Sequence, residues 1–160
     1  MKFSDERGSN AAFGRTSARE TVDSATFRKM NAMNSTEQDK KRILIVDDDP
    51  EISESTRLAL EALGYEVEVA RDGATGLALA ERRRPDLMIL DMMMPKRSGF
   101  LVLETLRQID DFPTRIVMIT ANEGNRHKEY AEKLGVDAYI RKPFPMDELI
   151  DAIERVLDER

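Results

Sequence analysis

The sequence predicts an α/β protein in which five parallel strands alternate with five helices, and three observations support this prediction. Short continuous apolar runs at 43–46, 87–90 and 116–119 are bounded by charged or turn-forming residues, as is typical of strands buried on both faces. Amphipathic helical stretches separate these runs. The segment 65–69 alternates between polar and apolar residues, which suits a half-exposed edge strand. Right-handed crossovers and this edge strand favour the strand order 2-1-3-4-5.

The first two helices carry recognisable start and stop residues. Asp49 can cap a helix with Pro50 in its first turn, and Gly64 follows the end of that helix. The pattern predicts a second helix over Gly73–Arg83, which Pro85 stops.

The remaining elements follow in the same alternation. A third helix begins at Ser98, a fourth covers about 125–134 and stops at Gly135, and 137–140 is a short fifth strand. In the third helix the residues expected to be buried are Leu101, Val102 and Leu106. The last helix has one apolar stripe, formed by Leu149, Ile150, Ile153, Val156 and Leu157.

Composition limits the chemistry that is available. The chain has 160 residues, 41% of them hydrophobic and 35% charged, with a net charge of −6. It has no Cys and a single His, which excludes disulfides, thiolate chemistry and sites built from several histidines. No apolar run approaches the roughly 18 residues of a membrane span. These features predict a soluble, cytoplasmic protein that works with carboxylates, hydroxyls and amines.

Residues 1–40 differ in character from the rest of the chain. Residues 1–42 carry nine Lys/Arg and six Asp/Glu, a balance of +3, whereas the remainder carries 16 and 25, a balance of −9. The early stretch lacks sustained periodicity, so we expect 1–40 to be a disordered or poorly structured tail and 41–160 to be the folded domain. Met30 or Met33 could be the true start, and a partner-binding or regulatory role for this stretch is the alternative.

Polar residues follow four of the predicted strands. Asp47 and Asp48 come after the first strand, Asp91 after the third, Thr120 after the fourth and Lys142 after the fifth. In an open α/β sheet the ligand crevice lies outside the carboxyl ends of the strands, so these side chains are expected to converge. Each residue also has an ordinary role, as a helix cap, a turn hydroxyl or a solvated loop residue.

The three carboxylates repel one another unless a cation neutralises them. A hard divalent ion with oxygen ligands fits such a site, and Mg²⁺ is the expected metal, for which Mn²⁺ could substitute. A carboxylate nucleophile, a metal, an ammonium and a hydroxyl are the groups needed to receive and hold a phosphoryl group.

With these features the sequence resembles the receiver domain of bacterial two-component response regulators, the CheY-like family with a flavodoxin-like fold. The resemblance covers about 41–160. The segments that carry it are 43–50 (ILIVDDDP), 90–95 (LDMMMP) with Gly99, 119–121 (ITA) and 139–144 (YIRKPF).

The resemblance implies a role for each acidic residue. Asp91 resembles the phosphoacceptor, which takes a phosphoryl group from a phosphohistidine on a sensor histidine kinase or a histidine phosphotransfer protein. Asp48 resembles the direct carboxylate ligand of Mg²⁺, and Asp91 itself and the Met93 backbone carbonyl would be further ligands. Asp47 resembles the second member of the acidic pair, acting through water.

The resemblance also implies a switch. Lys142 resembles the cation that pairs with the phosphoryl group, and the Lys142-Pro143 bond is expected to be cis. Thr120 resembles the hydroxyl that moves to the phosphoryl oxygen, and Tyr139 the aromatic residue that swings inward after it. The signal would then emerge on the face made by the fourth helix, the fifth strand and the last helix.

Two positions beside this chemistry vary in the family and tune the phosphoryl lifetime, Met93 and Asn122. An apolar Met93 should hinder an attacking water, which predicts a long-lived acyl phosphate; simple loop packing of residues 92–94 is the alternative. His127 is expected to be a solvated surface residue.

The predicted function is that of a single-domain response regulator rather than an enzyme, a phosphoacceptor that assists its own phosphorylation and dephosphorylation. A phosphatase of the haloacid dehalogenase type needs a second Asp where Met93 stands. A phosphorylation-independent adaptor and a fragment of a larger hybrid kinase or regulator stay open. We expect an unidentified downstream protein target, a possible phosphorylation-linked homodimer, and neither direct DNA binding nor membrane association.

Overall fold

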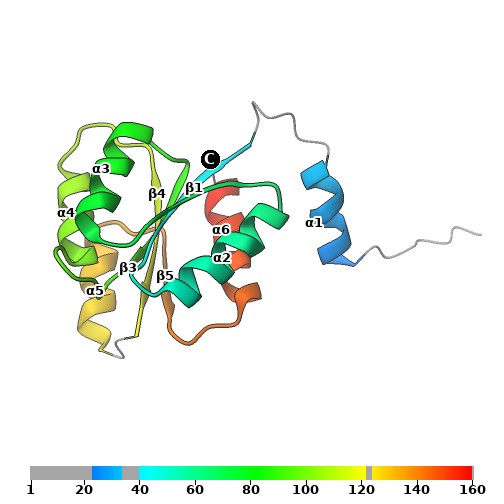
Figure 1. Ribbon diagram of the computed structural model, residues 1–160. Helices are drawn as coiled ribbons and strands as arrows, with labels where there is room; N and C mark the ends of the chain where they lie inside the picture. The colour runs from blue at the N-terminus through cyan, green and yellow to red at the C-terminus, as the bar shows by residue number, and fades with distance from the viewer. Residues whose placement is uncertain (1–22, 34–39, 122–123, 160) are drawn as a thin grey trace, which may run out of the picture.

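A five-stranded parallel sheet forms the centre of the protein (Figure 1). The computed structural model describes residues 23–33, 40–121 and 124–159. The strands are β1 (Arg42–Val46), β2 (Glu66–Ala70), β3 (Leu87–Asp91), β4 (Arg115–Thr120) and β5 (Ala138–Arg141). Their order is β2-β1-β3-β4-β5, which confirms the predicted fold class and strand order.

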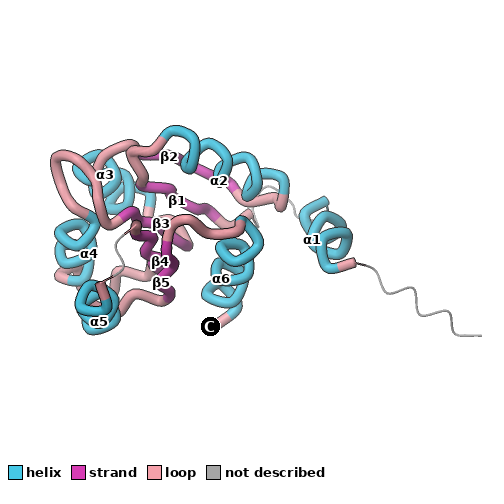
Figure 2. Tube along the Cα trace, turned by 90° about the horizontal axis from the view of Figure 1, so that it is seen from below, coloured by secondary structure: helices cyan, strands magenta, loops and turns pink. Residues whose placement is uncertain are grey.

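Helices cover both faces of the sheet. They are α1 (Ser24–Met33), α2 (Pro50–Ala62), α3 (Gly73–Arg83), α4 (Gly99–Arg107), α5 (Asn125–Lys133) and α6 (Met146–Asp158). Figure 2 shows α3, α4 and α5 on one face and α2 and α6 on the other, with α1 beyond them. Among the described helices, none has the length and apolarity that crossing a bilayer requires.

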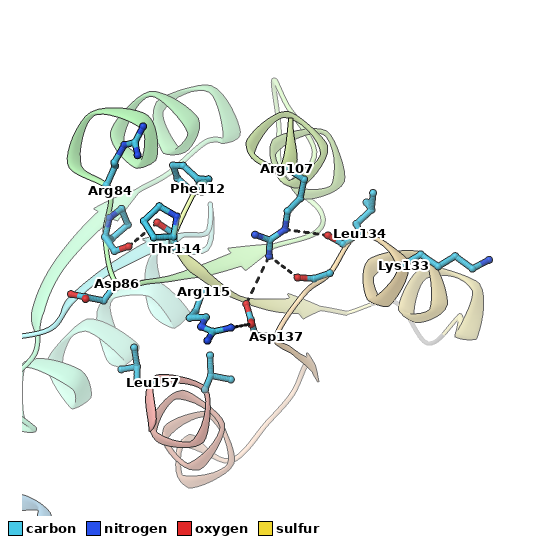
Figure 3. Close-up of a pocket in the computed structure, with 14 residues that line it drawn as sticks. Arg84, Asp86, Arg107, Phe112, Thr114, Arg115, Lys133, Leu134, Asp137 and Leu157 are labelled. Atoms are coloured by element: carbon cyan, nitrogen blue, oxygen red, sulfur yellow. Dashed lines mark hydrogen bonds and ion pairs between the residues drawn. The ribbon is translucent and has the colours of Figure 1, made fainter. Parts of the chain in front are cut away.

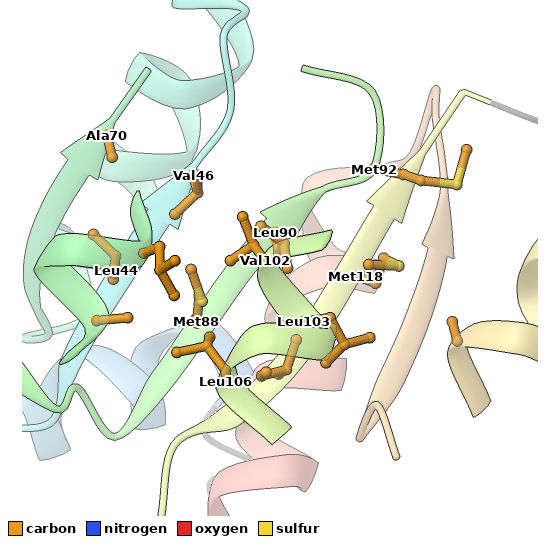
Figure 4. Packing of buried hydrophobic residues seen from close by; sticks show 14 residues of the cluster. Leu44, Val46, Ala70, Met88, Leu90, Met92, Val102, Leu103, Leu106 and Met118 are labelled. Carbon is orange, nitrogen blue, oxygen red and sulfur yellow. The ribbon is translucent and has the colours of Figure 1, made fainter. Parts of the chain in front are cut away.

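The core consists of two apolar clusters, one on each face of the sheet. The cluster under α3, α4 and α5 contains Leu44, Met88, Leu90, Val102, Leu106 and Met118, all at most 2% exposed (Figure 4). The cluster under α2 and α6 contains Ile43, Ile89, Val117, Leu149, Ile153 and Val156, also at most 2% exposed. Leu101 was predicted to be buried, but it is 46% exposed, because it lies on the outer face of α4.

Helices α2 and α3 begin at the residues that the sequence predicts. The carboxylate of Asp49 accepts hydrogen bonds from the backbone N–H groups of Glu51 and Ile52 and so caps α2. The helix α3 spans Gly73–Arg83, as predicted, and β2 shows the alternating burial of an edge strand.

The region before the domain departs from the expectation. Residues 1–40 were expected to lack regular structure, yet Ser24–Met33 forms helix α1. Ala, Arg, Lys and Met favour a helix over these ten residues, and Arg28 forms ion pairs with Asp151 and Glu154 of α6. The remaining residues of the proposed tail, 1–22 and 34–39, lie outside the described part of the chain.

Candidate functional site

Three carboxylates meet where β1 and β3 end. These strands are neighbours in register, with Val46 opposite Leu90, so the residues that follow them lie side by side. Carboxylate oxygens of Asp47, Asp48 and Asp91 all lie within 4.8 Å of one another. Asp47 is 1% and Asp91 4% exposed, whereas Asp48 is exposed to solvent. The sequence prediction that these residues converge is thus confirmed by the fold.

Lys142, just after β5, supplies the positive charge. Its Nζ lies 2.9 Å from Oδ2 of Asp47 and 3.4 Å from Oδ2 of Asp91. The second oxygen of each carboxylate accepts a backbone N–H: that of Asp49 for Asp47, at 2.9 Å, and that of Met93 for Asp91, at 3.3 Å. One ammonium therefore faces two buried carboxylates.

This imbalance changes the acid–base behaviour of the site. Burial and the charge of Asp47 raise the pKa of Asp91 to about 6, against the opposing effects of Lys142 and of the Met93 N–H. Burial works against the Lys142 ammonium, but the hydrogen bond and charge of Asp47 and the charge of Asp91 outweigh it and raise the pKa of Lys142. Lys142 therefore stays charged, and the cluster carries an excess negative charge.

The donor set suits a hard divalent cation. Three carboxylates and one ammonium leave two uncompensated negative charges when all the groups are ionised. Asp48 is exposed and can present its oxygens to an ion that keeps part of its water shell, as Mg²⁺ does. The residues thus fit Mg²⁺, and they contain no sulfur or imidazole ligand that would favour a softer metal.

The loop after β3 packs tightly against the backbone of Asp91. A Cβ atom at Gly99 would lie 2.2 Å from the carbonyl oxygen of Asp91, closer than any real contact. The Gly99 N–H instead donates to the carbonyl of Met92 at 3.0 Å. Glycine at the start of α4 therefore lets the helix abut the strand end and fixes the position of Asp91.

The two predicted switch residues lie on β4 and β5. Thr120 is fully buried, its hydroxyl lies 3.6 Å from the Met92 sulfur, and its carbonyl accepts the Lys142 N–H at 2.7 Å. Tyr139 is partly buried, and its hydroxyl is enclosed without a hydrogen-bond partner within the described ranges. Met92 as a neighbour of Thr120 was not predicted, because a loop methionine carries no sequence signal for that contact.

The other predicted features have mixed outcomes. The Lys142-Pro143 bond is cis, as expected. Met92 is buried and Met94 packs on the core, but Met93 is 63% exposed, so loop packing accounts for two of the three methionines. Asn122 lies outside the described residues.

The expectation for His127 is wrong. This residue is half-buried, and its ring stacks on Phe100 with 5.8 Å between centroids. Phe100, at the start of α4, also contacts Tyr130 edge-on at 5.3 Å. The start of α5 thus packs aromatically against α4, a contact between helices that the sequence did not reveal.

A cavity of about 840 Å³ lies at the opposite end of the sheet, before β3, β4 and β5 (Figure 3). Its arginines are engaged with the protein itself. Arg107 donates to the carbonyls of Leu134 and Gly135, and Arg115 pairs with Asp137 at 3.0 Å. These bonds link α4 and β4 to the segment between α5 and β5. None of the residues that line this cavity belongs to the acidic cluster.

A parallel α/β sheet with an acidic cluster at the carboxyl ends of its strands defines a class of protein, and comparison with known sequences shows which one. The sequence model of the response regulator receiver domain matches residues 43–154. The chain therefore belongs to the response regulator receiver domain family.

Individual relatives agree with this. The chain is 41% identical over 119 residues to the DNA-binding dual master transcriptional regulator RpaA of Synechocystis, covering 72% of this chain and 48% of RpaA. It is 41% identical over 117 residues to the response regulator MprA of Mycobacterium leprae, covering 72% of this chain and 50% of MprA. The chain thus spans about half the length of the curated relatives it matches.

A solved structure shows the same fold. The CheY-like receiver domain protein of Methanospirillum hungatei superposes with a TM-score of 0.71 at 37% identity, covering 75% of this chain and 95% of that protein. The matched part of this chain is therefore a receiver domain in fold as well as in sequence.

Proposed function

We propose that Asp91 accepts a phosphoryl group from a phosphohistidine of a sensor histidine kinase or a histidine phosphotransfer protein. An oxygen of the Asp91 carboxylate attacks phosphorus, the N–P bond breaks, and the imidazole leaves as an acyl phosphate forms. The observation that carries the proposal is the buried Asp91 carboxylate, 3.4 Å from the Lys142 ammonium and beside two further carboxylates.

Asp48, Asp91 and the Met93 carbonyl would hold Mg²⁺, or Mn²⁺ in its place, with Asp47 acting through water. When bound, the cation neutralises charge on the transferring oxygens. Lys142 also neutralises negative charge there, because its ammonium remains charged and contacts the Asp91 carboxylate oxygen directly. The protein thus assists its own phosphorylation and dephosphorylation, and it acts as a phosphoacceptor rather than as an enzyme on a separate substrate.

Phosphorylation would then change the face formed by α5, β5 and α6. The Thr120 hydroxyl donates to the Met92 sulfur, a weak acceptor, and would leave it to bond a phosphoryl oxygen. Tyr139, whose hydroxyl lacks a partner within the described residues, lies on the next strand and lines the groove of this face. In our proposal Thr120 and Tyr139 exchange between two arrangements, and phosphorylation shifts the equilibrium between them.

The partners of this face are proteins in our proposal. Residues 43–160 carry a net charge of −9, which disfavours direct binding of this domain to the phosphates of DNA. A downstream protein target is therefore expected, and a homodimer linked to phosphorylation is a further candidate. DNA binding by a protein such as RpaA is a property of a chain about twice the length of the matched region.

Intact mass after incubation with acetyl phosphate and Mg²⁺ tests the proposal. The wild type should gain one phosphoryl group, whereas Asp91→Asn and a metal-free control should gain none. Asp110→Asn, an exposed carboxylate, serves as the matched control and should be phosphorylated like the wild type. Absence of phosphorylation in a folded wild type, with both acetyl phosphate and a histidine donor, would favour a phosphorylation-independent adaptor.

A further inference from the structure

Among the described residues, Arg28 joins helix α1 to the domain through two ion pairs. Arg28 lies 2.6 Å from the Asp151 carboxylate through Nη2 and 3.2 Å from Glu154 through Nε. The Arg28 side chain is 25% exposed, so the contact encloses most of it. Both carboxylates belong to α6, which places α1 outside the α2 and α6 layer, as Figures 1 and 2 show.

The charges of the two helices are complementary. Over its ten residues α1 carries two cations, Arg28 and Lys29, and no carboxylate. Four of the five carboxylates of α6 occur at helical spacings i, i+4, i+7 and i+11, which places them along one side: Asp147, Asp151, Glu154 and Asp158. Arg28 engages the two central members of this row, so the contact has a definite register.

One of these carboxylates also belongs to the proposed output face. A groove of about 680 Å³ runs between α5 and α6 over β5, and Tyr139, Glu148 and Asp151 are among its lining residues. Asp151 thus faces the groove and pairs with Arg28. A partner that engages Asp151 from the groove and helix α1 compete for the same carboxylate.

The strength of the contact fits a displaceable element. Ion pairs between partly exposed side chains contribute little to stability and weaken with salt. Asp151 is 64% and Glu154 32% exposed, so both pairs are of this kind. Tethering compensates for the weakness, because a segment in the same chain acts at a high effective concentration.

We propose that helix α1 is an intramolecular competitor on the output face: it docks on α6 through Arg28, occupies Asp151, and leaves when a partner takes that carboxylate. The inference rests on the proposed function for the identity of the face, whereas the docking itself depends only on α1 and α6. Truncation or substitution at Arg28 should therefore free the face without changing the chemistry at Asp91.

Zero-length cross-linking tests the contact in the full chain. The variant Arg28→Lys places an amine near Asp151 and Glu154, and a carbodiimide joins an amine to a carboxylate in contact with it. We expect an amide between position 28 and one of these two carboxylates, identified by mass spectrometry of proteolytic peptides. Adding Asp151→Asn and Glu154→Gln to the variant should remove this cross-link. A folded Arg28→Lys chain that gives no such cross-link overturns the docking.

Carboxylate labelling with carbodiimide and glycine ethyl ester tests occupancy. Arg28→Ala should raise the labelling rates of Asp151 and Glu154 about fivefold, the factor that corresponds to 1 kcal/mol, and 0.5 M NaCl should remove the difference. Glu132, across the groove on α5, should not change. The matched control is Lys29→Ala; an equal effect of this variant would refute the specific role of Arg28.

The two proposals fail separately. Acetyl phosphate should phosphorylate Arg28→Ala at the rate of the wild type, because Arg28 contacts α6 and not the acidic cluster. Loss of phosphorylation in both proteins with intact cross-linking would sink the proposed function alone. Normal phosphorylation with unchanged labelling in Arg28→Ala would sink the competitor alone.

Discussion

Replacing the central carboxylate should stabilise the metal-free protein. Asp91 is 4% exposed, and its pKa is raised to about 6 by burial and by Asp47. In an unfolded chain an Asp has a pKa of about 3.9. The folded protein therefore disfavours the ionised form of this residue, and Asp91→Asn removes the charge while keeping the shape of the side chain.

The size of the effect follows from the two pKa values. A shift from about 3.9 to about 6 corresponds to roughly 3 kcal/mol of destabilisation once Asp91 is fully ionised. The pKa of about 6 already includes the favourable 3.4 Å contact with Lys142, so the loss of this contact reduces the gain no further. We therefore expect Asp91→Asn to raise the free energy of unfolding by about 3 kcal/mol at pH 7.5.

The pH dependence has a definite sign. Below about pH 4 Asp91 is protonated in both states, and its destabilisation vanishes. The destabilisation grows between about pH 4 and pH 6, because the folded state binds the proton more tightly there, and it is complete above about pH 6. The advantage of Asp91→Asn should follow the same course and disappear in acid.

Urea unfolding in the presence of EDTA, at pH 4 and pH 7.5, measures this difference. The exposed Asp110→Asn serves as the control and should stay within about 0.5 kcal/mol of the wild type. Adding Mg²⁺ should stabilise the wild type more than Asp91→Asn, since the variant lacks one carboxylate ligand. A variant less stable than the wild type at pH 7.5, or a gain that does not vary with pH, would refute the reasoning.

Three further substitutions test neighbouring parts of the site. Lys142→Met leaves Asp47 and Asp91 buried without a cation and should lower the free energy of unfolding by about 3 kcal/mol, measured with urea at pH 7.5 in EDTA. The control Lys128→Met, at an exposed position, should leave the free energy of unfolding almost unchanged. Gly99→Ala forces a Cβ to 2.2 Å from the Asp91 carbonyl and should cost about 3 kcal/mol and slow acetyl phosphate labelling. Gly135→Ala places its Cβ in ordinary contact with Arg107 Nε at 3.8 Å but keeps a φ of 76°, and it should cost only about 1 kcal/mol. Met93→Asn should hasten hydrolysis of the acyl phosphate about tenfold, equal to 1.4 kcal/mol in the barrier, as mass spectrometry over time would show; a slower decay contradicts a shielding role for Met93.

The fold was predictable because its signals are local or periodic. Apolar runs marked the buried strands, Asp49 and Pro50 marked the start of α2, and the stripe on α6 marked its buried face. Leu101 was misjudged because an apolar residue in a helix can lie on either face. The contact of helix α1 with the domain could not be predicted, because Arg28 pairs with Asp151, more than a hundred residues away in the sequence.

The candidate site was predictable to the level of its members. Parallel strands bring their carboxyl ends to one edge, so Asp47, Asp91 and Lys142 could be placed together from topology alone. The raised pKa of Asp91 could not be predicted, because its largest cause is burial. The stacking of His127 on Phe100 was equally hidden, since it requires the relative position of α4 and α5.

The acidic cluster and the output groove are joined by short connections, and this gives the charge imbalance a functional meaning in the proposed mechanism. The Lys142 side chain contacts Asp47 and Asp91, and its backbone N–H binds the carbonyl of Thr120 at 2.7 Å. Tyr139, three residues before Lys142, lines the groove. The roughly 3 kcal/mol associated with ionised Asp91 is as large as a typical coupling free energy between sites, about 1–3 kcal/mol. Neutralising or modifying Asp91 therefore involves a free energy of the size that the proposed mechanism needs to shift an equilibrium at the groove.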